Sequence, residues 1–262
     1  MNKLPLSVAI ITLNEENNIE RCLKSVFDLA AEIIIIDSGS TDRTAEIAAR
    51  YGAFFHFNEW PGHVAQKNYA VTRCTQPWVL SVDADEALDP ESQTAIREKL
   101  TAGKPLEDGY WVNRKTFYLN DWIRHAWYPE WRLRLVRKEI ACWEGSDPHD
   151  HMKEPEKTGR LQGHLLHYSY KDLQDHLMTT IKYARIGAKA DIEKGGGFKW
   201  HKLLFSPVFR FFRSLVIKQA WRDGWRGWII AFSSMLSCFA KYAFIYEHER
   251  APKQKKSGQP VS

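Results

Sequence analysis

The chain has 262 residues and a formal net charge of +5, so it can bury one α/β domain with an appendage, and an anionic partner is expected. Its four cysteines are widely separated, which excludes a disulfide framework and a zinc knuckle. No recognition-helix, zinc-finger or RNA-binding pattern points to nucleic acid. We therefore expect a cytoplasmic protein whose partner is a phosphorylated metabolite or an anionic membrane surface.

The first hundred residues alternate apolar, strand-like runs with helical periodicity. Strands are predicted at residues 6–12, 32–37, 53–57 and 78–82, and helices at residues 19–30, 43–51 and 63–73. This alternation is typical of right-handed βαβ units and a mostly parallel sheet. The N-terminal apolar run is too short for a signal peptide, so we assign it to the first strand.

Acidic and amide side chains follow three of the predicted strands. In chain order they are Asn14, Glu15, Asp37, Asp83 and Asp85. In an open α/β sheet, the carboxyl ends of parallel strands face a ligand crevice, so these groups should meet there. Asp83 and Asp85 would repel each other without a cation, which predicts a Mg²⁺ or Mn²⁺ ion that also holds a diphosphate.

No glycine-rich phosphate loop of the G-x-G-x-x-G or Walker type accompanies these acids. The metal must then hold the phosphates, while carboxylates at the first two strand ends can accept hydrogen bonds from a base and a ribose. Two simpler interpretations stay open. Asp83 and Asp85 could form an acidic turn before a helix that begins near Pro90, and Asp37 could be a turn residue only.

Four ordered segments resemble the signatures of family 2 glycosyltransferases, which are inverting enzymes of the GT-A fold. They are residues 12–16 (TLNEE), 36–42 (IDSGSTD), 66–68 (QKN) and 83–85 (DAD). The resemblance implies that the last segment binds the divalent metal on the donor diphosphate through Asp85.

The same resemblance implies a nucleotide-sugar site built from the other three segments. Thr12, Glu15 and Asp37 would hold the uracil and ribose, with Lys67 and Asn68 nearby. The wider chain, including WYPEWRLRLVR and LLHYSY, resembles the lipopolysaccharide core-oligosaccharide glucosyltransferase subgroup, which adds a sugar to inner-core heptose. UDP-glucose as donor and a lipid-linked saccharide as acceptor are therefore implied.

Short aromatic-rich strands are predicted at residues 109–114 and 131–137. Arg132 and Arg134 share one face of the second strand, where two guanidiniums suit an acceptor or another phosphate-bearing ligand. A charged, solvent-facing edge strand is the alternative. The aromatic residues from Tyr110 to Trp131 are expected to form core, with some of them lining an acceptor groove.

Inverting transfer needs a general base that takes the proton from the acceptor hydroxyl. Family members often carry Val-His-Glu where this chain has Pro-His-Asp at residues 148–150, so Asp150 is the base by position. The alternative is a metal cluster, whose members would be Asp147, His149, Asp150, His151, His164 and His167.

From residue 172 the apolar spacing predicts a helix that ends at the glycines 195–197. Beyond it, aromatic residues alternate with Lys and Arg, as in helices that lie on anionic lipid. The uncharged run 228–240 is shorter than the roughly 20 residues of a spanning helix, so peripheral attachment is predicted. A helical cover or an oligomer contact is the alternative.

Together these features predict an α/β, GT-A fold with a mostly parallel sheet flanked by helices and a C-terminal helical appendage. The expected domains are a catalytic domain at 1–168, divided at about residue 100 into donor and acceptor halves, a membrane-associating region at 169–250 and a disordered tail at 251–262. The expected function is metal-assisted, inverting sugar transfer at the inner face of the cytoplasmic membrane. A sugar nucleotidyltransferase and a non-catalytic membrane-binding scaffold are the alternatives.

Overall fold

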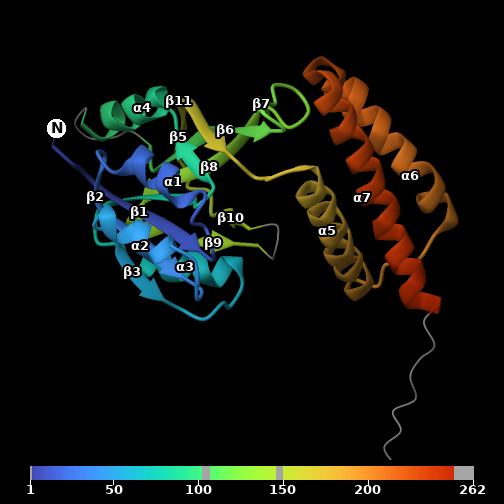
Figure 1. Ribbon diagram of the computed structural model, residues 1–262, viewed down its shortest axis with the longest axis horizontal. Coiled ribbons are helices and arrows are strands. Elements are labelled where there is room, and N and C mark those ends of the chain that lie inside the picture. The colour runs from blue at the N-terminus through green and yellow to red at the C-terminus, as the bar shows by residue number, and fades with distance from the viewer. Residues whose placement is uncertain (1, 102–106, 146–149, 251–262) are drawn as a thin grey trace, which may run out of the picture. The chain divides into compact units, whose positions relative to one another are not determined.

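A computed structural model of the protein describes residues 2–101, 107–145 and 150–250 (Figure 1). The chain divides into two compact units, one up to Tyr170 and one from Lys171. Three members of the predicted loop motif, Asp147, Pro148 and His149, and the predicted disordered tail lie outside the described residues.

The first unit is built on one mixed sheet with the strand order β3-β2-β1-β4-β8-β6-β11-β5, and β7 pairs with β6. The strands are β1 (Leu4–Thr12), β2 (Ala30–Asp37), β3 (Phe54–Phe57), β4 (Trp78–Asp83), β5 (Glu86–Leu88), β6 (Gly109–Tyr118), β7 (Asp121–Trp122), β8 (Glu130–Arg137) and β11 (Thr158–His167). A separate antiparallel pair joins β9 (Trp143–Glu144) to β10 (His151–Met152).

Strand directions bring the polar strand ends to one edge of this sheet. β1 runs parallel to β2 and β4, and β6 runs parallel to β11. Because β8 is antiparallel to both β4 and β6, those two strands point the same way. The carboxyl ends of β1, β2, β4, β6 and β11 therefore share one edge. The predicted α/β fold with a mostly parallel sheet is confirmed.

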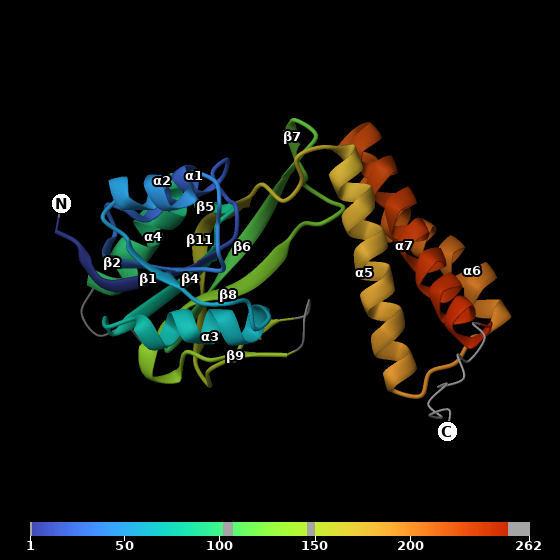
Figure 2. The same ribbon diagram turned by 60° about the horizontal axis from the view of Figure 1, so that its bottom comes forward.

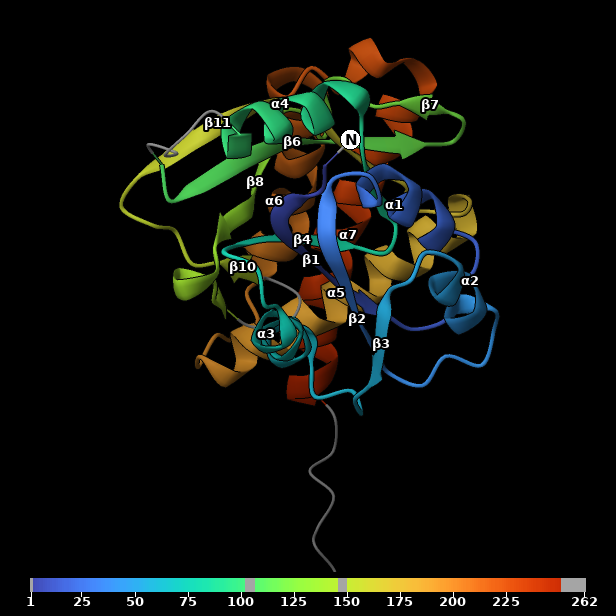
Figure 3. The same cartoon turned by 90° about the vertical axis from the view of Figure 1, so that its left-hand side faces the viewer.

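The helices of this unit cover both faces of the sheet (Figure 3). They are α1 (Ile19–Val26), α2 (Thr44–Arg50), α3 (His63–Arg73) and α4 (Pro90–Thr101), with a short 3-10 helix, η1, at Lys138–Ile140. Ile33 and Ile35 of β2 pack in the cluster that contains α1, α2 and α4, whereas Ile34 and Ile36 pack in the cluster that contains α3. The continuous apolar run of β2 is thus buried on both faces, as a central parallel strand requires.

Two predicted boundaries are wrong. The helix expected at residues 19–30 ends at Val26, because Ala30 already pairs with Leu4 and opens β2. The strand expected at 109–114 is also longer and runs to Tyr118.

The second unit is helical, as predicted (Figure 2). It contains α5 (Leu173–Glu193), α6 (Trp200–Phe212), a π-helical turn η2 (Arg213–Ile217), a 3-10 turn η3 (Ala220–Asp223) and α7 (Gly224–Arg250). Asp172 caps α5 by accepting a hydrogen bond from the backbone N–H of Asp175. α5 and α6 both pack along α7, which therefore forms the centre of this unit.

Candidate functional site

The loops after β1 and β2 are fastened together around Asp37. Its Oδ1 accepts the backbone N–H groups of Gly39 and Ser40 at 2.8 and 2.7 Å, and its Oδ2 accepts the Thr12 hydroxyl at 2.8 Å and the Ser40 hydroxyl at 2.5 Å. These four bonds occupy about all the acceptor sites of a carboxylate. Asp37 therefore serves the turn in this structure, and a ribose contact from it stays a prediction.

Asn14 and Glu15 complete the same loop pair. Asn14 has a left-handed backbone, with φ of 56°, and its Oδ1 accepts the Thr41 N–H at 2.9 Å. The Glu15 backbone donates to the Thr44 hydroxyl at 2.9 Å, and its carboxylate accepts the Asn18 amide at 3.0 Å. The first two family segments thus form one polar rim at the carboxyl edge of the sheet.

A chain of alternating charges occupies the centre of that edge. Lys67 Nζ of α3 lies 3.0 Å from Asp83 Oδ1 and 2.7 Å from Asp150 Oδ2. On the other side, Arg134 Nη2 of β8 lies 2.9 Å from Asp83 Oδ2 and 2.8 Å from Glu86 Oε1. The predicted base and the first acid of the DAD segment are therefore two neighbours of one ammonium group.

The charges of this cluster stabilise the ionised form of Asp83. Burial alone would raise the pKa of Asp83, but the nearby positive charges of Lys67 and Arg134 outweigh it and hold that pKa well below its ordinary range. Asp83 is thus a carboxylate at neutral pH, with an ion pair on each oxygen. In this structure it is a structural anion between two cations.

Asp85 points to a different neighbour. Its Oδ2 lies 3.3 Å from His167 Nε2 at the end of β11, and its backbone carbonyl accepts the Tyr168 N–H at 2.9 Å. A six-coordinate ion with bonds of about 2.1 Å holds adjacent ligands about 3 Å apart, so these two atoms fit one divalent ion. The predicted metal position is therefore chemically suitable, and its candidate second ligand is His167, which the sequence suggested only as a member of a different metal cluster.

The larger metal cluster considered from sequence is not formed by the described residues. His164 Nδ1 lies 3.0 Å from Asp89 Oδ2, and its Nε2 lies 3.2 Å from the Tyr128 hydroxyl. His164 therefore contacts other residues than His167, whose neighbour is Asp85. Across residues 2–101, 107–145 and 150–250 no group of three His, Cys, Asp or Glu side chains could hold a metal.

Arg132 and Arg134 lie on a central strand, because β8 is paired with both β4 and β6. The edge-strand alternative is therefore wrong. Arg132 Nη2 binds Glu130 Oε1 at 2.6 Å, and Arg134 is committed to two acids. The Nε atoms of both arginines and Nη1 of Arg134 are buried without a hydrogen-bond partner in the described structure. Phosphate binding by this pair stays a prediction, and those free donors suit it.

The aromatic residues divide between core and edge. Tyr110 and Tyr118 are fully buried, as core residues. Phe117, Trp122 and Tyr168 form a cluster beyond the carboxyl end of β6, with ring centroids 5.1 to 5.5 Å apart. Phe117 and Trp122 belong to the aromatic residues expected from sequence, and Tyr168, which was not among them, joins them on the same edge as His167.

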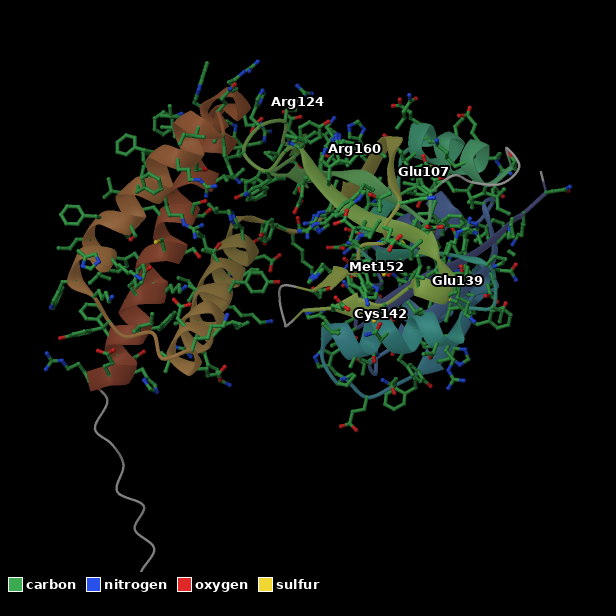
Figure 4. The ribbon with its side chains drawn as sticks, turned by 180° about the vertical axis from the view of Figure 1, so that it is seen from behind. Glu107, Arg124, Glu139, Cys142, Met152 and Arg160 are labelled. Carbon is green, nitrogen blue, oxygen red and sulfur yellow. The ribbon has the colours of Figure 1, made fainter. Side chains whose placement is uncertain are left out.

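Asn68 fastens the loop that carries the predicted base. Its Oδ1 accepts the Trp143 N–H at 2.8 Å, and its Nδ2 donates to the Trp143 carbonyl at 2.9 Å. Trp143 and Met152 of the β9–β10 pair then pack in the α3 cluster, and Figure 4 labels Met152 beside Cys142 there. Asn68, predicted to lie near the donor, has both polar groups engaged in holding this strand pair.

Replacing Asn68 with alanine should therefore destabilise the first unit by about 1–3 kcal/mol, because two backbone groups of Trp143 lose their partners. Urea unfolding followed by circular dichroism measures this. Gln76→Ala is a matched control, since its amide donates to its neighbour Thr75 at 3.2 Å. Equal unfolding midpoints for the two variants would contradict the fastening role.

Comparisons with known proteins agree with this geometry. A family model described as "Glycosyl transferase family 2" matches residues 7–152. The lipopolysaccharide core biosynthesis glycosyltransferase LpsC of Rhizobium meliloti (strain 1021) is 32% identical to this chain, and the match covers 94% of this chain and 93% of the LpsC chain. An uncharacterized glycosyltransferase of Rickettsia bellii (strain RML369-C) is 30% identical over 90% of this chain and 83% of its own. Among solved structures, S. aureus TarS superposes with a TM-score of 0.50 at 15% identity, over 89% of this chain and 49% of that one, which bears on the fold alone.

Proposed function

Because the chain belongs to glycosyl transferase family 2, as its four ordered segments predicted, we propose that it moves a sugar from a UDP-sugar to a lipid-linked saccharide with inversion at the anomeric carbon. The protein is a glycosyltransferase of the GT-A fold. LpsC is named for lipopolysaccharide core biosynthesis, which supports an acceptor of that class, such as inner-core heptose. Glucose is the sugar that we propose, from the subgroup resemblance of the sequence.

One observation carries the proposal. Lys67 Nζ stands between Asp83, which ends β4 on the donor side, and Asp150, which precedes β10 in the acceptor half. Donor and acceptor groups from segments 67 positions apart thus meet at the carboxyl edge of the sheet, where open α/β sheets bind ligands. A salt bridge with a structural role only could form between any two charged residues. Here the two carboxylates beside the Lys67 ammonium are an acid of the DAD segment and the proposed base, which favours a functional role.

The chemistry is a single displacement. The acceptor hydroxyl oxygen forms a bond to the anomeric carbon as the bond from that carbon to the diphosphate oxygen breaks, and UDP leaves with the electron pair. Asp150 takes the hydroxyl proton. Lys67 is near enough to Asp150 to orient its carboxylate, and its positive charge also suits the phosphates of the leaving group.

Asp85 and His167 are the residues that would hold a divalent ion, Mg²⁺ or Mn²⁺. When bound, such an ion neutralises charge that develops on the leaving diphosphate. Thr12, Asn14 and Glu15 form the rim that we assign to the uracil and ribose. The unpaired guanidinium donors of Arg134 and Arg132 are assigned to phosphate.

The reaction takes place, in this proposal, at the inner face of the cytoplasmic membrane, where a lipid-linked acceptor would be found. The two alternatives from sequence are less suitable. A nucleotidyltransferase is disfavoured by family membership and by the acidic loop after β1, and a non-catalytic scaffold has no reason to retain the acids of the DAD segment with Asp150.

A donor panel tests the proposal directly. Purified protein with Mg²⁺ is incubated with UDP- and GDP-sugars, and released nucleotide is measured. We expect hydrolysis of one UDP-sugar, UDP-glucose, because water can replace the absent acceptor slowly in such sites. Release from a GDP-sugar alone would refute the donor assignment, and no release even with a deacylated lipopolysaccharide core as acceptor would refute the transferase chemistry.

A further inference from the structure

One face of α6 exposes large apolar side chains. Its members are Trp200, Leu204, Phe205, Val208, Phe209 and Phe212, and their exposed fractions lie between 48% (Val208) and 71% (Phe205). At about 100° per residue these positions fall on one half of the helix, opposite the side that packs on α7. An apolar surface of this width marks an interaction site, and we call these six residues the apolar face.

The apolar face continues across the turn into α7. Val216 and Ile217 of η2 are 60% and 68% exposed, and Trp225 near the start of α7 is 55% exposed. The two helices are joined by Phe211, whose ring centroid lies 5.4 Å from that of Phe212 and 4.8 Å from that of Phe232 on α7. The exposed rings of α6 and α7 therefore belong to one surface.

The segment that carries this surface is almost entirely positive, although Glu249 of α7 lies near its Trp200 end, where it accepts the Phe198 N–H. Between residues 200 and 240 the basic residues are Lys202, Arg210, Arg213, Lys218, Arg222 and Arg226, and the one acid is Asp223. By helical spacing, Lys202 of α6 and Arg213 at the start of η2 border the apolar face on one side, whereas Arg210 lies on the side of α6 that faces α7. A helix with exposed aromatic rings and a basic flank is suited to the headgroup boundary of an anionic bilayer. A second copy of this chain is a poorer partner, because its basic residues would repel these.

α7 is the candidate for a span. The helix Ala220–Arg250 contains an 18-residue stretch with a mean hydropathy of 1.5, so by length and composition it could cross a membrane, and it is the one such helix in the described part of the chain. The uncharged run 228–240 is short, but the helix continues beyond it, so length alone does not exclude a span.

The packing of α5 on α7 decides between spanning and surface binding. Lys241 of α7 forms an ion pair with Asp191 of α5 at 2.7 Å, and Arg185 of α5 stacks on Phe244 at 4.7 Å. If α7 crossed the bilayer, α5 and its charged side chains would enter the hydrocarbon with it, at a high cost per charge. We propose that the C-terminal unit binds one leaflet of an anionic bilayer through the apolar face and the basic residues between 202 and 226, and that α7 does not span it.

Vesicle binding tests this surface independently of donor or acceptor. Full-length protein is sedimented with vesicles of phosphatidylcholine, with and without phosphatidylglycerol. We expect binding at least about tenfold tighter to the anionic vesicles, weakened but not abolished by high salt, because salt screens the charges and leaves apolar burial intact. Equal binding to both vesicle types, or none to either, would overturn the proposal.

Removal of two rings isolates the apolar part. Phe205 and Phe209 are both largely exposed, so the double serine variant should keep its fold and lose at least about tenfold in affinity. The matched control replaces Phe54 and Phe57 of β3, which are 56% and 69% exposed, and should bind as wild type. Circular dichroism and thermal unfolding check that both variants are folded. Wild-type affinity in the folded Phe205→Ser, Phe209→Ser variant would overturn the proposal.

Charge removal isolates the basic part. Glutamine replaces Arg210, Arg213, Lys218, Arg222 and Arg226 in one variant, and Lys24, Lys99, Lys153, Lys189 and Lys194 in its control. The first variant should lose its preference for phosphatidylglycerol and its salt dependence, because both arise from those charges, whereas the control should keep both. If the folded first variant bound like wild type, these five basic residues would not be lipid contacts, and the proposal would be overturned.

Two further measurements test the rivals. Alkaline carbonate should extract the protein from membranes of expressing cells, since it lies on one leaflet; retention in the membrane would mean that α7 spans it. Light scattering should show the same mass for wild type and the Phe205→Ser, Phe209→Ser variant. A dimer that the two substitutions dissociate would identify a second copy as the occupant.

Discussion

Asp85→Ala should abolish sugar transfer, and excess EDTA should do the same to the wild-type enzyme. Asp85 faces His167 at a separation that fits two ligands of one divalent ion, whereas Asp83 has both oxygens in ion pairs with Lys67 and Arg134. Loss of Asp85 removes a charged oxygen ligand, so leaving-group charge would develop without compensation. The rate should fall below detection in a radiolabelled-sugar transfer assay.

Metal binding gives a second reading of the same variant. Mn²⁺ bound in the presence of UDP, followed by electron paramagnetic resonance, should be lost in Asp85→Ala and weakened in His167→Ala. Asp28→Ala removes an exposed carboxylate elsewhere in the first unit and should leave binding and turnover unchanged. Full turnover of Asp85→Ala in EDTA would show that the transfer needs no ion at this position.

The sequence predicted the features that depend on local pattern. Periodicity placed β1 to β4 but missed the three-residue strand β5, and because parallel strands share a direction, the side chains after β1, β2 and β4 could be expected at one edge. The four family segments then added chemistry to that edge. Asp83, Asp85 and Asp150 needed no tertiary contact to be selected, only their positions after strands or within a motif.

The side-chain partners could not be predicted in this way, because they depend on contacts between distant segments. Arg134 was read as a free phosphate ligand, yet it is buried against Asp83 and Glu86, which lie about 50 positions earlier. Asn68 pairs with a backbone 75 positions away. His167 reaches Asp85 only because β11 pairs with both β6 and β5. The sequence of β11 does not alternate strictly between apolar and polar residues, so the strand could not be predicted from its pattern.

Glu86 illustrates the same limit on a shorter scale. It follows the DAD segment directly and could be taken for one more exposed acid, but it is 1% exposed and binds Arg134 and Arg114. Two guanidiniums compensate its burial, as a charge in the interior requires. The sequence held one signal for the burial of Glu86. The strand β8 carries Arg132 and Arg134 among apolar residues, and a buried arginine needs a buried acid as its partner.

Asp150→Asn should lower kcat by about 10² to 10⁴ while donor affinity changes by no more than a few-fold. The substitution keeps the size of the side chain and removes its ability to accept a proton, and Lys67 retains Asp83 as a partner at 3.0 Å. Initial rates at saturating acceptor give kcat, and UDP binding by calorimetry gives the donor side. Asp108→Asn is the matched control, since it breaks an ion pair with Arg137 of 2.9 Å at the opposite edge of the sheet and should leave kcat within a few-fold of wild type.

Asp150→Glu separates the role of the charge from that of the position. Glutamate keeps the proton-accepting carboxylate one methylene farther from the backbone, so Asp150→Glu should retain activity to within about tenfold, in contrast to the neutral Asn. If Asp150 only anchored Lys67, both Asn and Glu variants would shift donor affinity and leave kcat at saturation nearly unchanged. If the kcat of Asp150→Asn and that of Asp150→Glu both stay within a few-fold of wild type, another acid accepts the proton. A loss in Asp150→Asn that is confined to kcat identifies Asp150 as the base.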